Sequence, residues 1–98
     1  MNQVLLVGRF LEKDGRGMYM AVRSQDEKDT PIRVRVLLSN TLLDKLDQYN
    51  VSYNDMISIK GRLDNDGFGY NCVQAERIAF LSASQNYEKG GEISNGQI

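Results

Sequence analysis

The 98-residue sequence has no histidine, no tryptophan and a single cysteine, Cys72. With one cysteine, the chain can form neither an internal disulfide nor a zinc site built from cysteine and histidine. Catalytic triads that use histidine as the base are excluded as well. The remaining side chains offer little for catalysis. The composition therefore favours a binding or structural module over an enzyme, and we expect no cofactor and no metal.

Long apolar stretches are also lacking. No run approaches the roughly 18 consecutive apolar residues of a membrane-spanning helix, and the first residues lack the basic start of a signal peptide. We therefore expect a cytoplasmic protein with no membrane partner. A chain of this length, with 41% hydrophobic and 26% charged residues, is expected to form one globular domain.

Charge of one sign is not in excess, since the formal net charge is −1. The position of the charges matters more than their sum. Several basic residues fall inside predicted strands, whereas the acidic residues fall mostly in predicted turns and in the predicted helix. Such segregation gives a nearly neutral protein a positive face, which is the property that a phosphate chain recognises.

Apolar residues alternate with polar ones in five segments, which predicts strands over residues 2–12, 18–23, 32–38, 56–63 and 70–81. Leucines at helical spacing predict a short helix over residues 40–48. The segment from Ser39 to Thr41 offers its cap, with Asp44 in capping-box position after Thr41. Residues 64–67 (DNDG) give a strong hairpin signal. The apolar pattern stops at Ser82, so we expect a domain over residues 1–82 and a flexible tail over residues 83–98.

The first predicted strand is apolar on both faces. Leu5, Val7 and Leu11 cannot share one small barrel core with the opposite face of the strand, so a second copy of the chain is expected to cover them, as a dimer or tetramer. Gly8, in the middle of this run, suggests a bend or bulge. The change of spacing between Ala75 and Ile78 suggests a second bulge. We also expect inward-facing side chains at Ile32, Val34, Val36 and Leu38 in the third strand, at Ile57, Ile59 and Leu63 in the fourth, and at Val73, Ala75, Ile78 and Phe80 in the fifth.

The element order predicts an all-β fold. Five short strands with one helix between the third and the fourth is the layout of the OB-fold, a five-stranded, partly open barrel. An open sandwich with one covering helix fits the same order less well, because it gives no reason for a glycine inside a strand that is apolar on both faces.

Three segments in this order resemble the bacterial single-stranded DNA-binding protein family. Residues 4–9 (VLLVGR) are similar to the opening strand of those proteins, residues 57–63 (ISIKGRL) to their fourth strand, and residues 75–81 (AERIAFL) to the end of their fifth. The resemblance covers the whole predicted domain and extends to the related primosomal replication protein. It implies an OB-fold that forms dimers or tetramers, binds single-stranded DNA and contacts other replication proteins.

The chain departs from that family where the family usually stacks bases. Residues 24–30 contain no aromatic side chain, and the third strand carries Ile32 and Leu38 where aromatic residues are common. The predicted hairpin keeps one ring, that of Phe68. The end of the chain, residues 90–98, lacks the acidic tip that recruits partners in the family. The resemblance therefore transfers the fold more directly than the contacts to DNA.

The candidate DNA-binding residues are basic residues on predicted strands and aromatic residues that are not assigned to the predicted core. Pairs of basic side chains share one face of the third strand and of the fourth, as rows that could neutralise phosphates. Exposed rings stack on bases of any sequence. The predicted set is Arg9, Tyr19, Arg23, Arg33, Arg35, Lys60, Arg62, Phe68 and Tyr70. The alternative interpretation of these basic residues is a solvent-exposed strand face that has no ligand and resists pairing with other strands. Ion pairs at Arg33 and Arg35, with acidic groups lining the face, would contradict this site.

Two functions remain after this reasoning. The first is a non-enzymatic protein that binds single-stranded DNA with little sequence preference, in replication, recombination or repair. The alternative is a primosome-like or plasmid-encoded accessory module that acts mainly through contacts with other proteins. The few aromatic candidates and the nearly zero net charge favour the alternative, whereas the fold and the basic strands favour the first.

Overall fold

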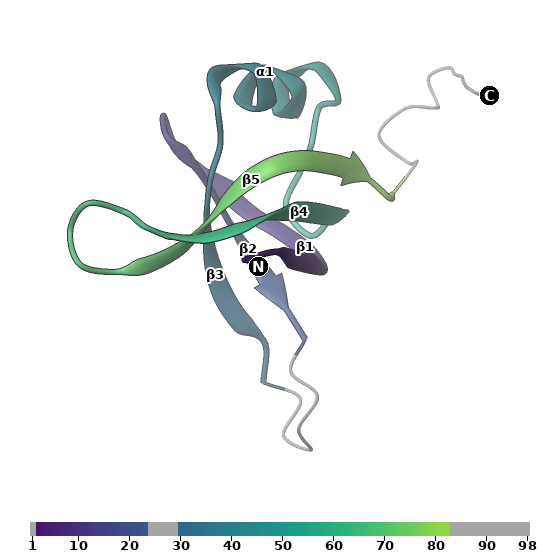
Figure 1. Cartoon of the computed structure of the whole chain (residues 1–98). Helices are drawn as coiled ribbons and strands as arrows, with labels where there is room; N and C mark the ends of the chain where they lie inside the picture. The colour runs from purple at the N-terminus through teal and green to yellow at the C-terminus, as the bar shows by residue number, and fades with distance from the viewer. Residues whose placement is uncertain (1, 24–29, 83–98) are drawn as a thin grey trace.

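The computed structural model describes residues 2–23 and 30–82. The predicted tail, residues 83–98, lies outside them. The described residues form five strands and one helix, in the predicted order (Figure 1). The elements are β1 (Val4–Lys13), β2 (Gly17–Val22), β3 (Ile32–Leu37), α1 (Asn40–Gln48), β4 (Met56–Asn65) and β5 (Asn71–Phe80).

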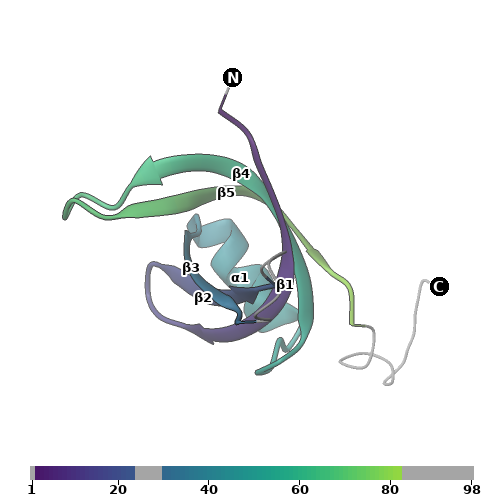
Figure 2. The same ribbon diagram turned by 90° about the horizontal axis from the view of Figure 1, so that it is seen from below.

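The strands close into a barrel in the order β1-β2-β3-β5-β4. The β3–β5 pair is parallel and short, whereas the other neighbours are antiparallel. Figure 2 shows the strands curving around this barrel, with β4 and β5 continuing beyond it as a two-stranded arm. Helix α1 lies across one end of the barrel (Figure 1). The predicted five-stranded barrel with a helix between the third and fourth strands is thus confirmed.

The barrel interior is filled by one face of each strand. Met18 and Met20 of β2, Val36 of β3, and Ile57 and Ile59 of β4 are fully buried. Two leucines of α1, Leu42 and Leu46, close the core from the end of the barrel. Alternation in the sequence predicted this face correctly for the middle of each strand, because side chains of a strand point to opposite faces in turn.

Two side chains predicted to be buried are exposed. Ile32 is 53% exposed and Leu63 is 57% exposed. Ile32 begins β3 and pairs with the last residue of β2, at the end of that hairpin. Leu63 lies on β4 beyond Gly61, which is the last β4 residue that pairs with β1. Both side chains lie on the predicted face of their strand, but at positions beyond the part of the barrel that covers this face.

The two predicted bulges have different outcomes. In β5 the register against β4 shifts between Ala75 and Arg77, so the predicted bulge between Ala75 and Ile78 is confirmed. In β1 the shift lies between Phe10 and Glu12, not at Gly8. Gly8 instead stands where β1 pairs with both β2 and β4. A Cβ atom there would lie 2.2 Å from the carbonyl oxygen of Ala21, so glycine is required by a close approach of two backbones.

Helix α1 has the predicted bounds, and its cap lies in the predicted segment from Ser39 to Thr41. The N-cap is Ser39, whose Oγ accepts a hydrogen bond from the backbone N–H of Leu42 at 3.2 Å. This choice places Leu42, and not Asp44, at the third helical position, so the predicted capping box does not form. The helix is nine residues long. Within residues 2–23 and 30–82, no helix is long and apolar enough to cross a membrane.

Candidate nucleic-acid interface

Three of the predicted site residues meet on the outer face of β2 and β3. Tyr19 of β2 pairs with Arg35 of β3, and the next outward pair is Ala21 with Arg33. The guanidinium carbon of Arg33 lies 4.1 Å from the centre of the Tyr19 ring, and that of Arg35 lies 4.9 Å from it. Both distances are within the range of cation–π interactions. The tyrosine is therefore a support for two cations in this structure.

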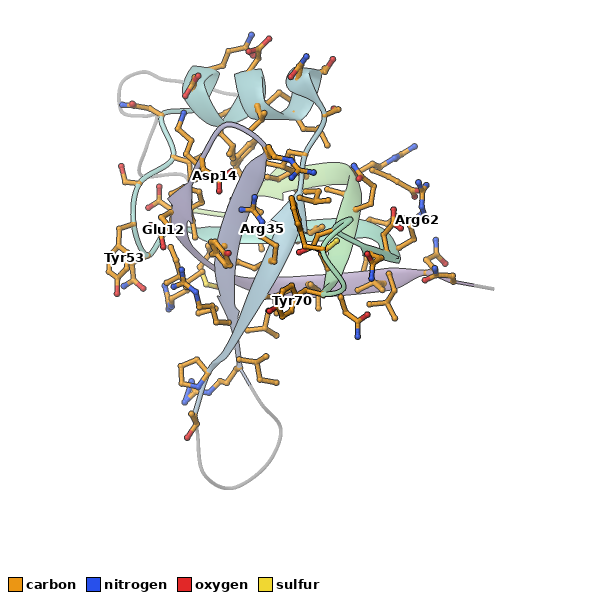
Figure 3. The ribbon with its side chains drawn as sticks, turned by 90° about the vertical axis from the view of Figure 1, so that its left-hand side faces the viewer. Glu12, Asp14, Arg35, Tyr53, Arg62 and Tyr70 are labelled. Atoms are coloured by element: carbon orange, nitrogen blue, oxygen red, sulfur yellow. The ribbon has the colours of Figure 1, made fainter. Side chains whose placement is uncertain are left out.

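Two acidic side chains of β1 and the following turn neutralise these cations. Arg33 Nη2 lies 2.5 Å from Glu12 Oε2, and Arg35 Nη1 lies 3.0 Å from Asp14 Oδ2. Figure 3 shows Asp14 close to Arg35 across the intervening strand. The expectation that Arg33 and Arg35 present free guanidinium groups is therefore wrong. The bulge after Phe10 is the cause, because it turns Glu12 to the outer face opposite Tyr19.

The two ion pairs differ in burial. The Arg33 side chain is 54% exposed and its partner 61%, whereas the Arg35 side chain is only 18% exposed. Asp14 Oδ1 also accepts hydrogen bonds from the backbone N–H groups of Arg16 and Gly17. The Arg16 N–H and then the Arg35 guanidinium hold the pKa of Asp14 below its usual value. Arg35 is thus tied to a fixed carboxylate, and Arg33 to a solvated one.

The outer face of β4 and β5 carries a second group of cations. Lys60 of β4 pairs directly with Arg77 of β5, and Arg62 Nη1 lies 3.4 Å from Glu76 Oε2. Two like charges in directly opposed positions destabilise a sheet unless an anion is bound between them. Arg77 was not among the predicted site residues. The changed spacing between Ala75 and Ile78 contained the signal, because a bulge there turns Arg77 outward.

The tip of the β4–β5 hairpin exposes the two predicted rings. Phe68 is 74% exposed and Tyr70 is 71% exposed. The Oδ1 atom of Asp66 accepts hydrogen bonds from the backbone N–H groups of both residues, at 2.7 and 3.2 Å. Gly67 and Gly69, at φ +90° and +93°, supply the left-handed backbone that the turn requires. Within the described residues, no cluster of acidic side chains could hold a metal ion. The carboxylate of Asp66 accepts the hydrogen bonds that close the turn.

Arg9 and Arg23 line a cleft of about 510 Å³. Arg9 pairs with Ala21 of β2, which pairs in turn with Arg33 of β3. The cleft runs between β1, the end of β2 and the turn that connects α1 to β4. Its lining includes Val7, Arg9, Ala21, Arg23, Tyr53 and Met56. The guanidinium group of Arg9 donates a hydrogen bond to the backbone oxygen of Asn54 at 3.0 Å. Nothing in the sequence connects Tyr53 with Arg9, because they are 44 residues apart.

No protein-family model and no curated protein sequence matches the chain. Solved structures match it over nearly the whole described region. The N-terminal domain of PriB from Thermoanaerobacter tencongensis is 19% identical, with a TM-score of 0.60, over 83% of this chain and 97% of that one. A small single-stranded DNA-binding protein from Streptomyces coelicolor is 17% identical, with a TM-score of 0.67, over 85% and 97%. PriB from Ralstonia solanacearum is 11% identical, with a TM-score of 0.68, over 83% and 99%.

The chain has an OB-fold. On this OB-fold the nine predicted residues fall into four places, which are the outer face of β2 and β3, the outer face of β4, the hairpin tip and the cleft beside β1. Figure 3 views the barrel from the side on which Arg35 and Tyr70 lie near the middle, with Tyr53 at one edge and Arg62 at the other. Of the nine predicted residues, Tyr19, Arg33 and Arg35 are brought into direct contact. The contact of the nine residues with DNA stays a prediction.

Proposed function

We propose that this OB-fold protein binds single-stranded DNA with little sequence preference, as a non-enzymatic cytoplasmic factor in replication, recombination or repair. The observation that carries the proposal is the β4–β5 arm, where two exposed rings stand at a hydrogen-bonded tip and Lys60 pairs directly with Arg77 on the same two strands. Rings of this kind stack on any base, and cations along a strand neutralise the backbone. The similarity to PriB and to a single-stranded DNA-binding protein over the whole domain supports the same conclusion.

In this proposal the nine residues have different roles. Phe68 and Tyr70 stack on bases, and Lys60 binds a phosphate on β4. Arg62 binds a phosphate once that phosphate replaces the carboxylate of Glu76. Arg9 and Arg23 extend the positive surface past β1. Tyr19, Arg33 and Arg35 contribute only after phosphates replace the carboxylates that now pair with the guanidinium groups.

A titration with fluorescent oligo-dT at two salt concentrations tests the proposal. If about four phosphates are neutralised, affinity should fall about 100-fold between about 50 and about 300 mM salt, because each phosphate contributes about 0.7 to the logarithmic slope. Phe68→Ala should weaken binding by about tenfold through loss of one stacked base. Lys60→Ala should lower the salt slope, whereas Lys45→Ala, a control on α1, should leave it unchanged. Absence of binding at the lower salt would overturn the proposal.

One observation favours the alternative, a module that acts through protein contacts. Glu12 and Asp14 neutralise two of the predicted DNA-binding arginines, which lowers the attraction of that face for a polyanion. Under the alternative, a tagged chain retrieves a replication protein, while its affinity for oligo-dT is no higher than that of nonspecific binding. The titration and the retrieval together separate the two functions.

We also propose that the chain self-associates through β1. Residues 4–7 pair with β4, and β2 joins β1 only from Gly8 onward, so among the described residues one edge of this segment has no neighbour. Leu5 is 74% exposed and Val7 is 51% exposed beside that edge. A second copy can add its own strand there and cover both side chains.

Light scattering tests this association. We expect at least a dimer at about 50 μM, where mass action favours assembly. Leu5→Asp should give a monomer, because it places a carboxylate in the proposed apolar contact. Ile32→Asp, an exposed apolar position on the β2–β3 hairpin, should leave the mass unchanged. A monomeric mass of the unaltered chain at this concentration would contradict the prediction.

A further inference from the structure

The cleft beside β1 is bounded by a turn that is held rigidly. The backbone N–H of Asn54 donates to the oxygen of Phe10 at 2.7 Å, and the N–H of Phe10 donates to the oxygen of Asp55 at 2.8 Å. Asp55 Oδ2 also accepts a hydrogen bond from the N–H of Ser52 at 3.0 Å. These bonds fix the turn on β1, although Asn54 adopts a left-handed backbone with φ +76°. Asparagine tolerates this conformation, so the turn keeps its place on β1.

The turn places the exposed ring of Tyr53 at the edge of the cleft. Tyr53 is 71% exposed, and in the described parts of the chain no ring stacks on it and no cation covers it. Tyr19, by contrast, lies under two guanidinium groups. Figure 3 shows Tyr53 pointing outward at the margin of the barrel. Tyr53 is therefore a ring with an open face, and its position is set in advance by the backbone.

The charge of the cleft differs from that of the face around Tyr19. Among the residues that the structure describes, its lining contains Arg9 and Arg23 and no acidic side chain. The guanidinium of Arg9 uses one donor on the oxygen of Asn54, which places it beside the Tyr53 turn. A guanidinium has five N–H donors, so others remain for a phosphate, which it binds in a two-pronged manner.

We propose that this cleft binds one nucleotide of single-stranded DNA, with its base stacked on Tyr53 and its phosphate on Arg9. The inference rests on the proposed function and adds a site to it. Ala21 and Met56 supply apolar surface beneath the base. The volume of about 510 Å³ lies within the range of small-ligand sites, about 300–1,000 Å³. A second copy of the chain is the competing occupant. A phosphate chain complements the charge of this lining, whereas a second copy placed symmetrically on it would bring the same cations to face Arg9 and Arg23.

The test measures oligo-dT affinity of the full chain with Tyr53→Ala, Tyr53→Phe and Arg9→Ala. Tyr53→Ala should weaken binding about five- to 100-fold, the effect of one lost stacking contact, and Tyr53→Phe should restore it. Arg9→Ala should weaken binding and lower the salt slope by about 0.7, the contribution of one phosphate. Because Tyr53 is exposed, thermal unfolding of its variants should match that of the unaltered chain. Oligo-dT that carries 5-iodouracil should crosslink to the peptide containing Tyr53.

The outcomes separate this site from the proposed function. If the unaltered chain binds oligo-dT and Tyr53→Ala binds equally well without a crosslink at the turn, the site is overturned and the function stands. If Tyr53→Ala lowers the mass in light scattering and leaves DNA affinity unchanged, the cleft is an interface between copies and the site is overturned. If the unaltered chain does not bind oligo-dT, both the function and the site are overturned.

Discussion

Replacement of Gly61 by alanine should lower the free energy of unfolding by about 2–3 kcal/mol, the cost of forcing an extra group into a packed site. Gly61 lies beside the β5 bulge and pairs with Ala75. A Cβ atom at this position would lie 2.1 Å from the carbonyl oxygen of Gln74. Because that oxygen belongs to the backbone, it cannot move aside as a side chain would. The β4–β5 pair would have to separate at the point where it leaves the barrel.

Urea unfolding followed by circular dichroism measures this effect. Gly15→Ala is the matched control, since a Cβ there would meet nothing within 4 Å, and its effect should stay within about 0.5 kcal/mol. Gly8→Ala and Gly17→Ala should resemble Gly61→Ala, because each would place a Cβ 2.1–2.2 Å from a backbone oxygen. Equal stability of Gly61→Ala and Gly15→Ala would show that the strands can separate at little cost.

The sequence was sufficient to predict the barrel, because the patterns that indicate each strand and the helix lie within short segments of the chain. Alternation fixes which face of a strand is buried, and the helix α1 has the bounds that its leucine spacing predicts. The bulge between Ala75 and Ile78 was also visible, because the inward residues change their spacing across it. The ends of the strands were less predictable. Ile32 and Leu63 carry the right pattern, but only the three-dimensional closure decides where the barrel stops covering them.

The ion pairs that neutralise Arg33 and Arg35 could not be predicted, because they join residues that are far apart in the sequence. From an inward Phe10, strict alternation would turn Glu12 inward, away from any arginine. One extra residue in β1 reverses that direction and brings Glu12 to Arg33, which is 21 residues away. Asp14 reaches Arg35 from a turn, where an acidic residue normally needs no partner. The cleft at Tyr53 likewise joins a turn after α1 to strands near the N-terminus.

Neutralisation of Glu12 in β1 and of Asp14 in the following turn, by Glu12→Gln with Asp14→Asn, should raise the affinity for oligo-dT by at least tenfold at low salt. In the present structure their carboxylates occupy the positions that phosphates would take on Arg33 and Arg35. Once they are neutral, two more cations are available to the backbone of the DNA. The logarithmic salt slope should therefore steepen by up to about 1.4, at about 0.7 for each added phosphate contact. Titrations across a series of salt concentrations measure both quantities.

Neutralising Glu12 and neutralising Asp14 should raise the affinity for DNA by different amounts, because the surroundings of the two carboxylates differ. Glu12→Gln should supply most of the gain, since the Arg33–Glu12 pair is solvated and exposed pairs contribute little to stability. Asp14→Asn should also loosen the turn at Arg16 and Gly17. The lowered pKa of Asp14 means that its stabilising effect is present above the pKa of the unfolded chain and is lost as the pH falls through the lower pKa of the folded chain. Asp14→Asn should therefore remove part of the acid sensitivity of folding.

A change of net charge alone could raise the affinity for DNA, so the comparison needs an acid elsewhere. Asp44 of α1 is exposed and forms no ion pair with the other described residues. Asp44→Asn makes the same change in net charge as Glu12→Gln, at a site away from the arginines. If the two variants gain equally, the effect is a long-range one of total charge. If only Glu12→Gln gains, the carboxylate competes locally with phosphate for Arg33, and the ion pairs on the outer face of β2 and β3 limit how tightly this barrel holds DNA.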